Sequence, residues 1–371
     1  MKSLVGLVCG AVVAAMSSCA GGPAASVAPV VRAELDASVA FAPIDAAAIP
    51  EASPPMIVAD ASDPPREPQM IANGLDPIEA IALDESDAYI LTRSAPGAWR
   101  LYRIAKRGGV AARLDDFHAE SVSVAVDDHA FYIATAQPIS EAIQGGNFRT
   151  SAYGRVVVAP KVGGGRATIF DGLRAAYGVA VHGENVYWLS GAVDGSGGVT
   201  VDSIMKGRTS GGGATHFAMK QIGATSVTAD GTAVYFAVAG RFDDRKHAWP
   251  AGAILRAAIS GGAPSTLAAT AEQPHAIALD DAAVYWIDRR GALSRVAKSG
   301  GPAALVADKV ERFALDGARV YAASGGVITA RAKSGGDVVA RWESAAPVTA
   351  IAIDGAFVYF ASGGELRRAP K

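Results

Sequence analysis

Short apolar runs separated by turns rich in Asp and Gly recur from about residue 77 onward. The clearest copy contains four such runs, Pro274–Leu279, Val284–Ile287, Leu293–Lys298 and Ala303–Val306. β-branched and aromatic residues fill these runs, while Asp and Gly supply the positive φ values that tight hairpins require. The pattern therefore predicts a repeated, four-stranded antiparallel unit.

A tyrosine marks every copy of this unit and stands five residues after the turn residue each time. The seven copies pair Asp84 with Tyr89, Asp127 with Tyr132, His182 with Tyr187, Asp230 with Tyr235, Asp280 with Tyr285, Asp316 with Tyr321 and Asp354 with Tyr359. Successive tyrosines are separated by roughly the 40–50 residues of one propeller blade. The repeat predicts an all-β fold, a seven-bladed β-propeller, with six or eight blades as the alternatives.

The ends of the repeat predict how the ring closes. A Gly-Gly turn follows the third strand in six copies, but the last copy runs through Glu365–Lys371 without one and lacks a fourth strand. Pro68–Ala72, ahead of the first copy, reads as a single strand with no partners of its own. We expect it to complete the last blade, a three-plus-one closure that leaves no bare sheet edge.

A family resemblance accompanies the repeat. Val186-Tyr187-Trp188 and Val284-Tyr285-Trp286-Ile287-Asp288 resemble the Tyr-Trp-x-Asp core of low-density-lipoprotein-receptor-type propellers and related bacterial repeat proteins. The resemblance covers residues 68–371 and implies the propeller fold without implying a function. Asp288 alone matches the motif's Asp, and the receptor propellers typically have six blades.

The N-terminal residues are typical of an export signal. Lys2 precedes an apolar run from Leu4 to Met16, which is too short to span a bilayer comfortably. Met16-Ser17-Ser18-Cys19 resembles the bacterial lipobox, so we expect a signal peptide over residues 1–18 and acylation of Cys19, with an ordinary secretory signal as the alternative. Ala20 after the cysteine resembles the pattern of lipoproteins sent to the outer membrane.

Composition completes the domain plan. Residues 19–67 are rich in Ala and Pro and predict a flexible tether, followed by the propeller at 68–371. The net charge of −2 disfavours a nucleic-acid partner. Cys9 would be lost with the signal peptide, so no disulfide is expected. Neither a Gly-x-Ser-x-Gly nor a His-Glu-x-x-His motif occurs, and we expect no cofactor, no metal and a monomer.

Long connections predict a ligand-binding lobe. Between the second and third strands, three consecutive copies carry long segments, 136–153, 191–201 and 239–252, where the other copies have short turns. Long loops in compact folds are usually functional or disordered. The candidate ligand-binding residues here are Tyr153, Arg241, Asp243, Asp244, Arg245, His247 and Trp249. A solvated charged loop is the alternative for the third segment.

A second candidate is the mouth of the central channel. Glu79, Tyr177, His275 and Glu311 each stand five residues before the turn residue, at the entry to the first strand of a copy. The alternative is ordinary polar residues at strand ends. The function that we predict is a non-catalytic binding or scaffold module for a protein, glycan or small ligand. The alternatives are a propeller-type lyase or hydrolase with acid/base groups at the channel mouth, and a purely structural lipoprotein.

Overall fold

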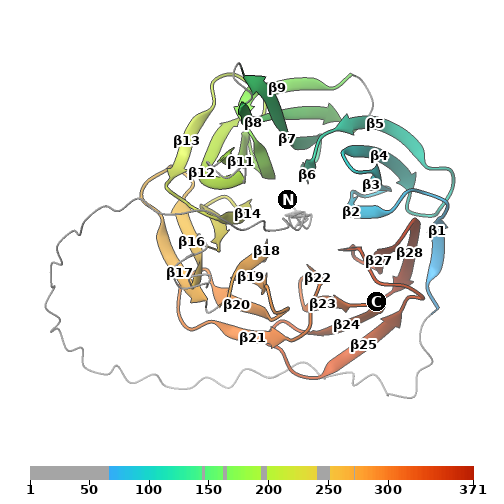
Figure 1. Ribbon diagram of the computed structural model, residues 1–371. Helices are drawn as coiled ribbons and strands as arrows, with labels where there is room; N and C mark the ends of the chain where they lie inside the picture. Colours follow the sequence, from blue (N-terminus) through green and yellow to red (C-terminus); the bar gives the residue numbers. More distant parts are fainter. Residues whose placement is uncertain (1–66, 144–146, 162–164, 194–198, 240–250, 271) are drawn as a thin grey trace, which may run out of the picture.

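The chain forms a seven-bladed β-propeller, as predicted. The computed structural model describes residues 67–143, 147–161, 165–193, 199–239, 251–270 and 272–371. These residues form 28 strands in seven four-stranded antiparallel sheets arranged around a central axis (Figure 1).

Each blade takes its strands in sequence order, from the axis outward, except the last. Blades 1 to 3 comprise β2 (Ile78–Leu83), β3 (Asp87–Ala95), β4 (Ala98–Ala105) and β5 (Ala112–His118); β6 (Ser121–Val126), β7 (Ala130–Ile143), β8 (Asn147–Pro160) and β9 (Ala167–Arg174); and β10 (Ala176–His182), β11 (Asn185–Val193), β12 (Val199–Arg208) and β13 (Thr215–Met219). Blades 4 to 6 comprise β14 (Ala224–Ala229), β15 (Ala233–Val238), β16 (Gly252–Ala258) and β17 (Ser265–Thr270); β18 (Pro274–Leu279), β19 (Ala283–Asp288), β20 (Leu293–Ala297) and β21 (Ala304–Ala307); and β22 (Arg312–Leu315), β23 (Arg319–Ser324), β24 (Val327–Ala332) and β25 (Val338–Glu343). Blade 7 comprises β26 (Ala350–Ile353), β27 (Phe357–Ser362), β28 (Glu365–Pro370) and β1 (Gln69–Ala72).

The three-plus-one closure is confirmed. β1 pairs antiparallel with β28, with Gln69 opposite Arg368 and Met70 opposite Arg367. Ile71 is buried in the core that blade 7 shares with blade 1. The first segment of the propeller therefore holds the last blade in place.

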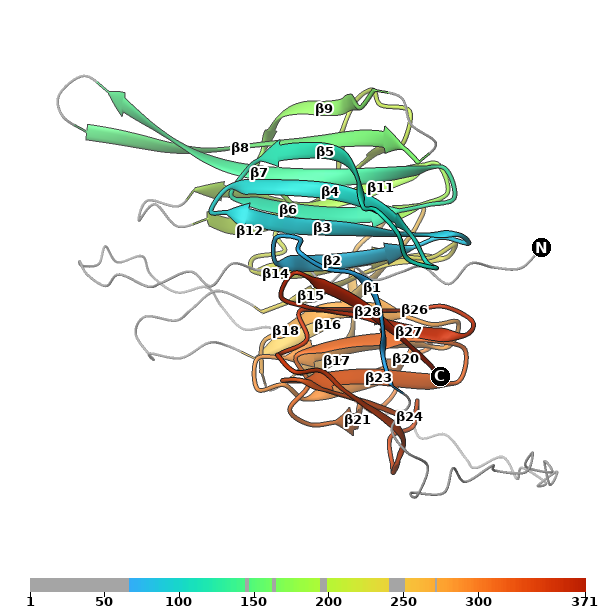
Figure 2. The ribbon, with the colours of Figure 1, turned by 90° about the vertical axis from the view of Figure 1, so that its right-hand side faces the viewer.

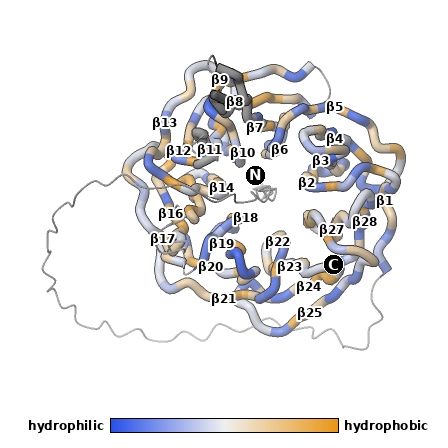
Figure 3. The backbone as a smooth tube through the Cα atoms, in the orientation of Figure 1, coloured by the Kyte–Doolittle hydropathy of each residue, from blue (hydrophilic) through white to orange (hydrophobic). Residues whose placement is uncertain are grey.

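The hydrophobic cores lie between consecutive blades. Tyr359 and Leu366 of blade 7, for example, pack in one cluster with Ile81 and Ile90 of blade 1. The second strands of the blades are buried almost throughout, as in β19 and β27, and apolar stretches lie around the ring (Figure 3). Each sheet therefore packs against the blade on either side. The stacking of sheets around the ring is thus driven by burial of apolar surface.

The strand connections divide between the two ends of the propeller. The Asp-containing turns and the Gly-Gly turns emerge at one end, which we call the turn face. The connections between second and third strands emerge at the other, which we call the loop face. Figure 2 shows β7 and β8 extending past the other strands on the loop face. Within the described ranges, no helix has the length and apolar character needed to cross a membrane.

Candidate functional site

The repeated Asp and Tyr form a hydrogen-bonded unit in five of the blades. Asp280 is representative: its Oδ1 accepts hydrogen bonds from the backbone amides of Ala282 (2.8 Å) and Ala283 (2.7 Å), which closes the turn. Its Oδ2 accepts a hydrogen bond from the hydroxyl of Tyr285 at 2.9 Å. The other four such pairs are Tyr89 with Asp84, Tyr132 with Asp127, Tyr321 with Asp316 and Tyr359 with Asp354. The constant spacing of five residues thus reflects a bond between the two side chains.

A lysine from the following blade binds the same type of aspartate. Lys333 of blade 6 reaches Asp280 of blade 5, with 2.8 Å between Nζ and Oδ2. Equivalent ion pairs join Lys161 to Asp84, Lys298 to Asp230, Lys371 to Asp316 and Lys106 to Asp354. We call the aspartate, the tyrosine five residues after it and this lysine an inter-blade clasp. Each clasp links two blades at the turn face.

The clasps are largely shielded from water. The side chains of Lys333 and Asp280 are 17% and 11% exposed. The ammonium groups of Lys106, Lys161, Lys298 and Lys371 lie 5.6–5.8 Å from the centre of the tyrosine ring in the same clasp. Such a cation over an aromatic face adds a further attraction. The clasps are therefore compact, charge-balanced units.

The clasps perturb the ionisation of both partners. Burial alone would raise the pKa of Asp316, but the bonds to Lys371, to two backbone amides and to Tyr321 outweigh burial and hold the pKa at about 2. Burial and the hydrogen bond to Asp280 raise the pKa of Tyr285 to about 12, and burial with Asp127 does the same for Tyr132. The folded state therefore favours ionised aspartates and neutral tyrosines.

These pKa shifts predict that the stability of the fold is constant at intermediate pH and falls at both acidic and alkaline pH. Because the folded pKa of Asp316 lies below its ordinary 3.8, its contribution is present above about pH 4 and is lost as the pH falls toward 2. Because the pKa values of Tyr132 and Tyr285 lie above the ordinary 10.0, their contribution is present below about pH 10 and is lost as the pH rises toward 12. Urea midpoints measured across this range should be flat between these limits and fall outside them. If an Asp316→Asn variant loses stability at acidic pH to the same extent as the parent, Asp316 does not contribute to that loss.

Blades 2, 3 and 4 depart from the clasp pattern. The lysine stands two residues before the Gly-Gly turn, but Thr209 and Ile259 occupy that position in blades 3 and 4. Ile259 faces the blade whose turn residue is His182 rather than Asp, so both halves of that clasp are replaced. The hydroxyl of Tyr187 is buried there and finds no hydrogen-bond partner among the residues that the structure describes.

Close packing replaces the clasp between blades 2 and 3. Phe170 of blade 2 stacks on Trp188 of blade 3 with 4.9 Å between ring centres. Gly207 leaves room for the Phe170 ring, because a side chain at that position would collide with it. This part of the interface therefore depends on close packing rather than on a lysine–aspartate pair.

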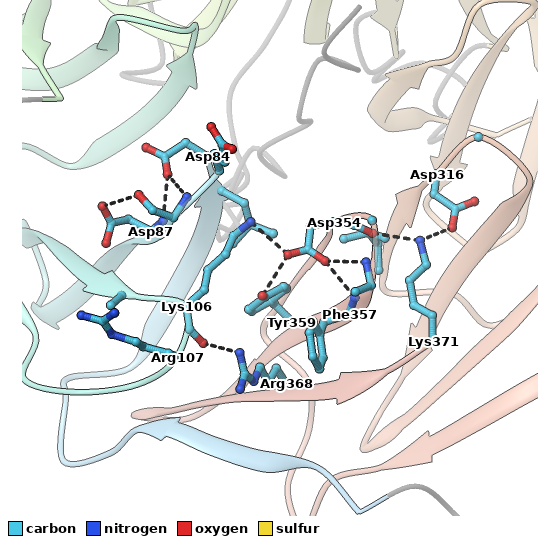
Figure 4. Close-up of a pocket in the computed structure, with 18 of the residues that line it drawn as sticks. Asp84, Asp87, Lys106, Arg107, Asp316, Asp354, Phe357, Tyr359, Arg368 and Lys371 are labelled. Atoms are coloured by element: carbon cyan, nitrogen blue, oxygen red, sulfur yellow. Dashed lines mark hydrogen bonds and ion pairs between the residues drawn. The ribbon is translucent and has the colours of Figure 1, made fainter. Parts of the chain in front are cut away.

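A cavity opens at the turn face beside three of the clasps. It has a volume of about 1300 Å³ and is lined by blades 6, 7 and 1. Lys106 points to Asp354 and Lys371 to Asp316 within its wall (Figure 4), so these four charges are already paired. Sequence reasoning missed this cavity and the clasps, although the lysine before four of the six Gly-Gly turns was a visible signal.

The predicted lobe lies partly within the described residues. Segment 136–153 is not an irregular loop: β7 and β8 pair continuously from Ala130 with Pro160 to Ile143 with Asn147. Segment 191–201 likewise contains the ends of β11 and β12. Arg241, Asp243, Asp244, Arg245, His247 and Trp249 lie outside the described residues, as does Cys19.

Tyr153 stands where the β7–β8 pair leaves the body of blade 2. Its hydroxyl donates a hydrogen bond to Asp171, and Arg155 lies over its ring, 5.8 Å from the centre. Arg174 and Asp202 form an ion pair between blades 2 and 3 on the same face, at 3.5 Å. The base of the lobe is thus held by polar contacts around Tyr153.

The four predicted channel-mouth residues are not bonded to one another in the described part of the chain. Among the described residues, no hydrogen bond or ion pair joins any two of Glu79, Tyr177, His275 and Glu311. Burial, with the charge of Glu120, raises the pKa of Tyr177 to about 12. Burial lowers the pKa of His275, against a smaller opposing effect of the Gln273 carbonyl, so its imidazole is held neutral.

Threonines at the equivalent positions of two other blades form hydrogen bonds to the next blade. The hydroxyl of Thr225 donates to the carbonyl of Pro274 in the next blade at 2.6 Å, and that of Thr349 donates to the carbonyl of Ile78. The channel mouth therefore contains links between blades. In the described part of the chain, no group of three or more His, Cys, Asp or Glu residues is arranged to hold a metal ion.

Comparison with known proteins supports the fold. No model of a known protein family matches the chain, and no curated protein does. The computationally designed Ika8 protein is similar, with a TM-score of 0.51 and 14% identity, over 82% of this chain and 100% of that one. The extracellular domain of a hybrid two-component system from B. thetaiotaomicron has a TM-score of 0.51 and 10% identity, over 81% of this chain and 40% of that one. BamB from Moraxella catarrhalis has a TM-score of 0.46 and 15% identity, over 80% and 86%. At these identities, the likeness to the first two structures shows the propeller fold alone.

Proposed function

We propose that the chain is a non-catalytic binding or scaffold module of the bacterial outer membrane, with repeats of the low-density-lipoprotein-receptor type. A signal peptide over residues 1–18 directs export, a lipid on Cys19 anchors the protein, and residues 19–67 tether the propeller at 68–371. The partner is a protein, glycan or small ligand held at the loop face of blades 2 to 4.

The observation that carries the proposal is the length of the β7–β8 pair. Both strands have 14 residues, whereas the equivalent strands of blade 5, β19 and β20, have six and five. Six or seven residues of each strand pass beyond the pairing with β6 and β9 and stand clear of the body (Figure 2). A structure that projects from its own blade in this way is typical of a binding element.

The use of the ionisable groups also favours binding over catalysis. Apart from Tyr132 and Tyr177, the aspartates and tyrosines with strongly shifted pKa values belong to the clasps, where each aspartate has a lysine partner. Acid/base chemistry needs groups within hydrogen-bonding reach of a common substrate atom. Among the described residues, Glu79, His275 and Glu311 are not joined by hydrogen bonds or ion pairs, so the structure gives no preformed acid/base pair at the channel mouth.

The proposal is tested by trimming the three long connections to the short form found at Arg289–Gly291. The trimmed chain should lose binding to envelope extract and to a glycan panel by at least about tenfold, since an interface without its central contacts loses several kcal/mol. The trimming keeps Ala136, Val201 and Ala239, which pack in the blade cores, so the urea midpoint should stay close to that of the parent.

Separate trimming of the three connections, with the same residues kept, assigns the effect to one of them. If the fully trimmed chain folds and keeps every partner, the lobe is not the binding site.

A further inference from the structure

The projecting part of β7 and β8 is a two-stranded ribbon with two edges. It consists of residues 137–143 of β7 and 147–153 of β8, paired in register from Gln137 with Tyr153 to Ile143 with Asn147. β6 pairs with β7 only as far as Ala136, and β9 pairs with β8 only from Tyr153 onward. In the described part of the chain, no further strand pairs with either edge of this ribbon.

Backbone hydrogen bonds determine which residues face each edge. The amide of Asp127 donates to the carbonyl of Ala130, so even-numbered residues of β7 face β6. The amide of Lys161 donates to the carbonyl of His129, so odd-numbered residues of β8 face β7. Neither ladder contains a register shift. The backbone groups of even-numbered β8 residues therefore point to the outer side, where β9 lies in the body of the blade.

The two edges of the ribbon differ. On β7 the outward residues are Pro138, Ser140 and Ala142, and the proline has no amide to donate. A proline at this point is a common protection of a free strand edge. On β8 the outward residues are Phe148, Thr150 and Ala152, each of which keeps its amide and carbonyl. The outer edge thus offers an unblocked row of donors and acceptors.

We propose that the outer edge of β8 binds an extended peptide segment of a partner protein by strand addition, in line with β9. The proposal rests on the proposed function and specifies how the ribbon holds its partner. Main-chain hydrogen bonds to Phe148, Thr150 and Ala152 supply the affinity, as in other cases of strand addition. The partner segment must be extended and must lack proline at the residues that face β8.

The length of the edge favours a peptide over a second copy of the chain. Five residues of strand span about 17 Å, which matches a bound segment of five or six residues. A stable dimer usually buries about 1,200–2,000 Å² in total, which a pairing of this length does not reach. A short peptide segment can bind through main-chain hydrogen bonds without burying an area of that size.

Ser140 and Thr150 provide a matched pair of variants. They lie opposite each other in the ribbon, and each presents an outward amide, on opposite edges. Thr150→Pro removes a donor from the proposed site, whereas Ser140→Pro removes one from the edge that Pro138 already blocks. Neither change removes a hydrogen bond between β7 and β8.

The probes are heptapeptides selected on the intact chain from a random phage-displayed library, then synthesised with a fluorescent label. We expect Thr150→Pro to weaken their binding by at least tenfold in fluorescence anisotropy, and Ser140→Pro by less than twofold. Hydrogen exchange should show protection of the amides of Phe148, Thr150 and Ala152 when peptide is present.

Equal binding to both variants, or the selection of no peptide, overturns strand addition. Either result would leave the proposed function standing, because that function is tested separately by trimming. If trimming the ribbon abolishes binding to envelope extract, the lobe is still the binding region. Circular dichroism of both variants checks that the propeller is intact.

Discussion

We expect Asp280→Ala to lower the free energy of unfolding by about 3 kcal/mol, among the largest effects of any single substitution at the turn face. The change removes the acceptor for two backbone amides and for the Tyr285 hydroxyl, and it leaves the ammonium of Lys333 without its partner. Removing one member of a buried ion pair typically costs 3–5 kcal/mol. We expect the lower end because Lys333 keeps some contact with water. Urea unfolding followed by circular dichroism measures the effect.

Two substitutions serve as matched controls for Asp280. Asp281→Ala changes the exposed neighbour in the same turn and should cost less than about 0.5 kcal/mol. His182→Ala changes the equivalent turn residue of blade 3, where Ile259 replaces the lysine, and should cost less than about 1 kcal/mol. Equal losses for Asp280→Ala and His182→Ala would show that the clasp adds no stability beyond the turn.

The second large effect is expected from the closing strand. Deleting residues 68–73 should lower the melting temperature by about 10 °C or more, because it removes the ladder between β1 and β28 and exposes the core that Ile71 covers. Deleting residues 25–52 should leave the melting temperature unchanged. Differential scanning calorimetry compares the two chains.

Point substitutions in β1 keep this test informative if the deletion prevents folding. Ile71 is 6% exposed and Met70 is 41% exposed, on opposite faces of the same strand. Ile71→Ala should cost about 2–4 kcal/mol and Met70→Ala less than about 1 kcal/mol. Similar losses for both variants would contradict the idea that β1 stabilises the propeller by burying Ile71 in the core.

Much of the fold followed from periodicity. The offset of five residues between Asp and Tyr located every blade, since the turn and the second strand that it spans have the same length in all copies. β18 begins and ends at the predicted residues, Pro274 and Leu279. The closure could be predicted because Pro68–Ala72 had no neighbours of its own to pair with.

The clasps were harder to predict, because their members come from different blades. Lys106 and Asp354 are far apart in sequence and meet only once the ring is closed. The ribbon was interpreted as a loop because Pro138 and the polar residues around it hide the alternation of a strand. The pairing of β7 with β8 in the ribbon is a backbone ladder, which the pattern of side chains in the sequence does not reveal.

The one-blade offset of the clasps has a consequence for how such rings arise. A clasped blade carries an aspartate for the blade after it and a lysine for the blade before it, as blade 5 does with Asp280 and Lys298. A tandem duplication of that blade inserts a unit that already matches both neighbours, so the ring can grow by recombination without leaving a charge unpaired. At the interface of blades 3 and 4, His182 and Ile259 stand where the repeat elsewhere has the aspartate and the lysine.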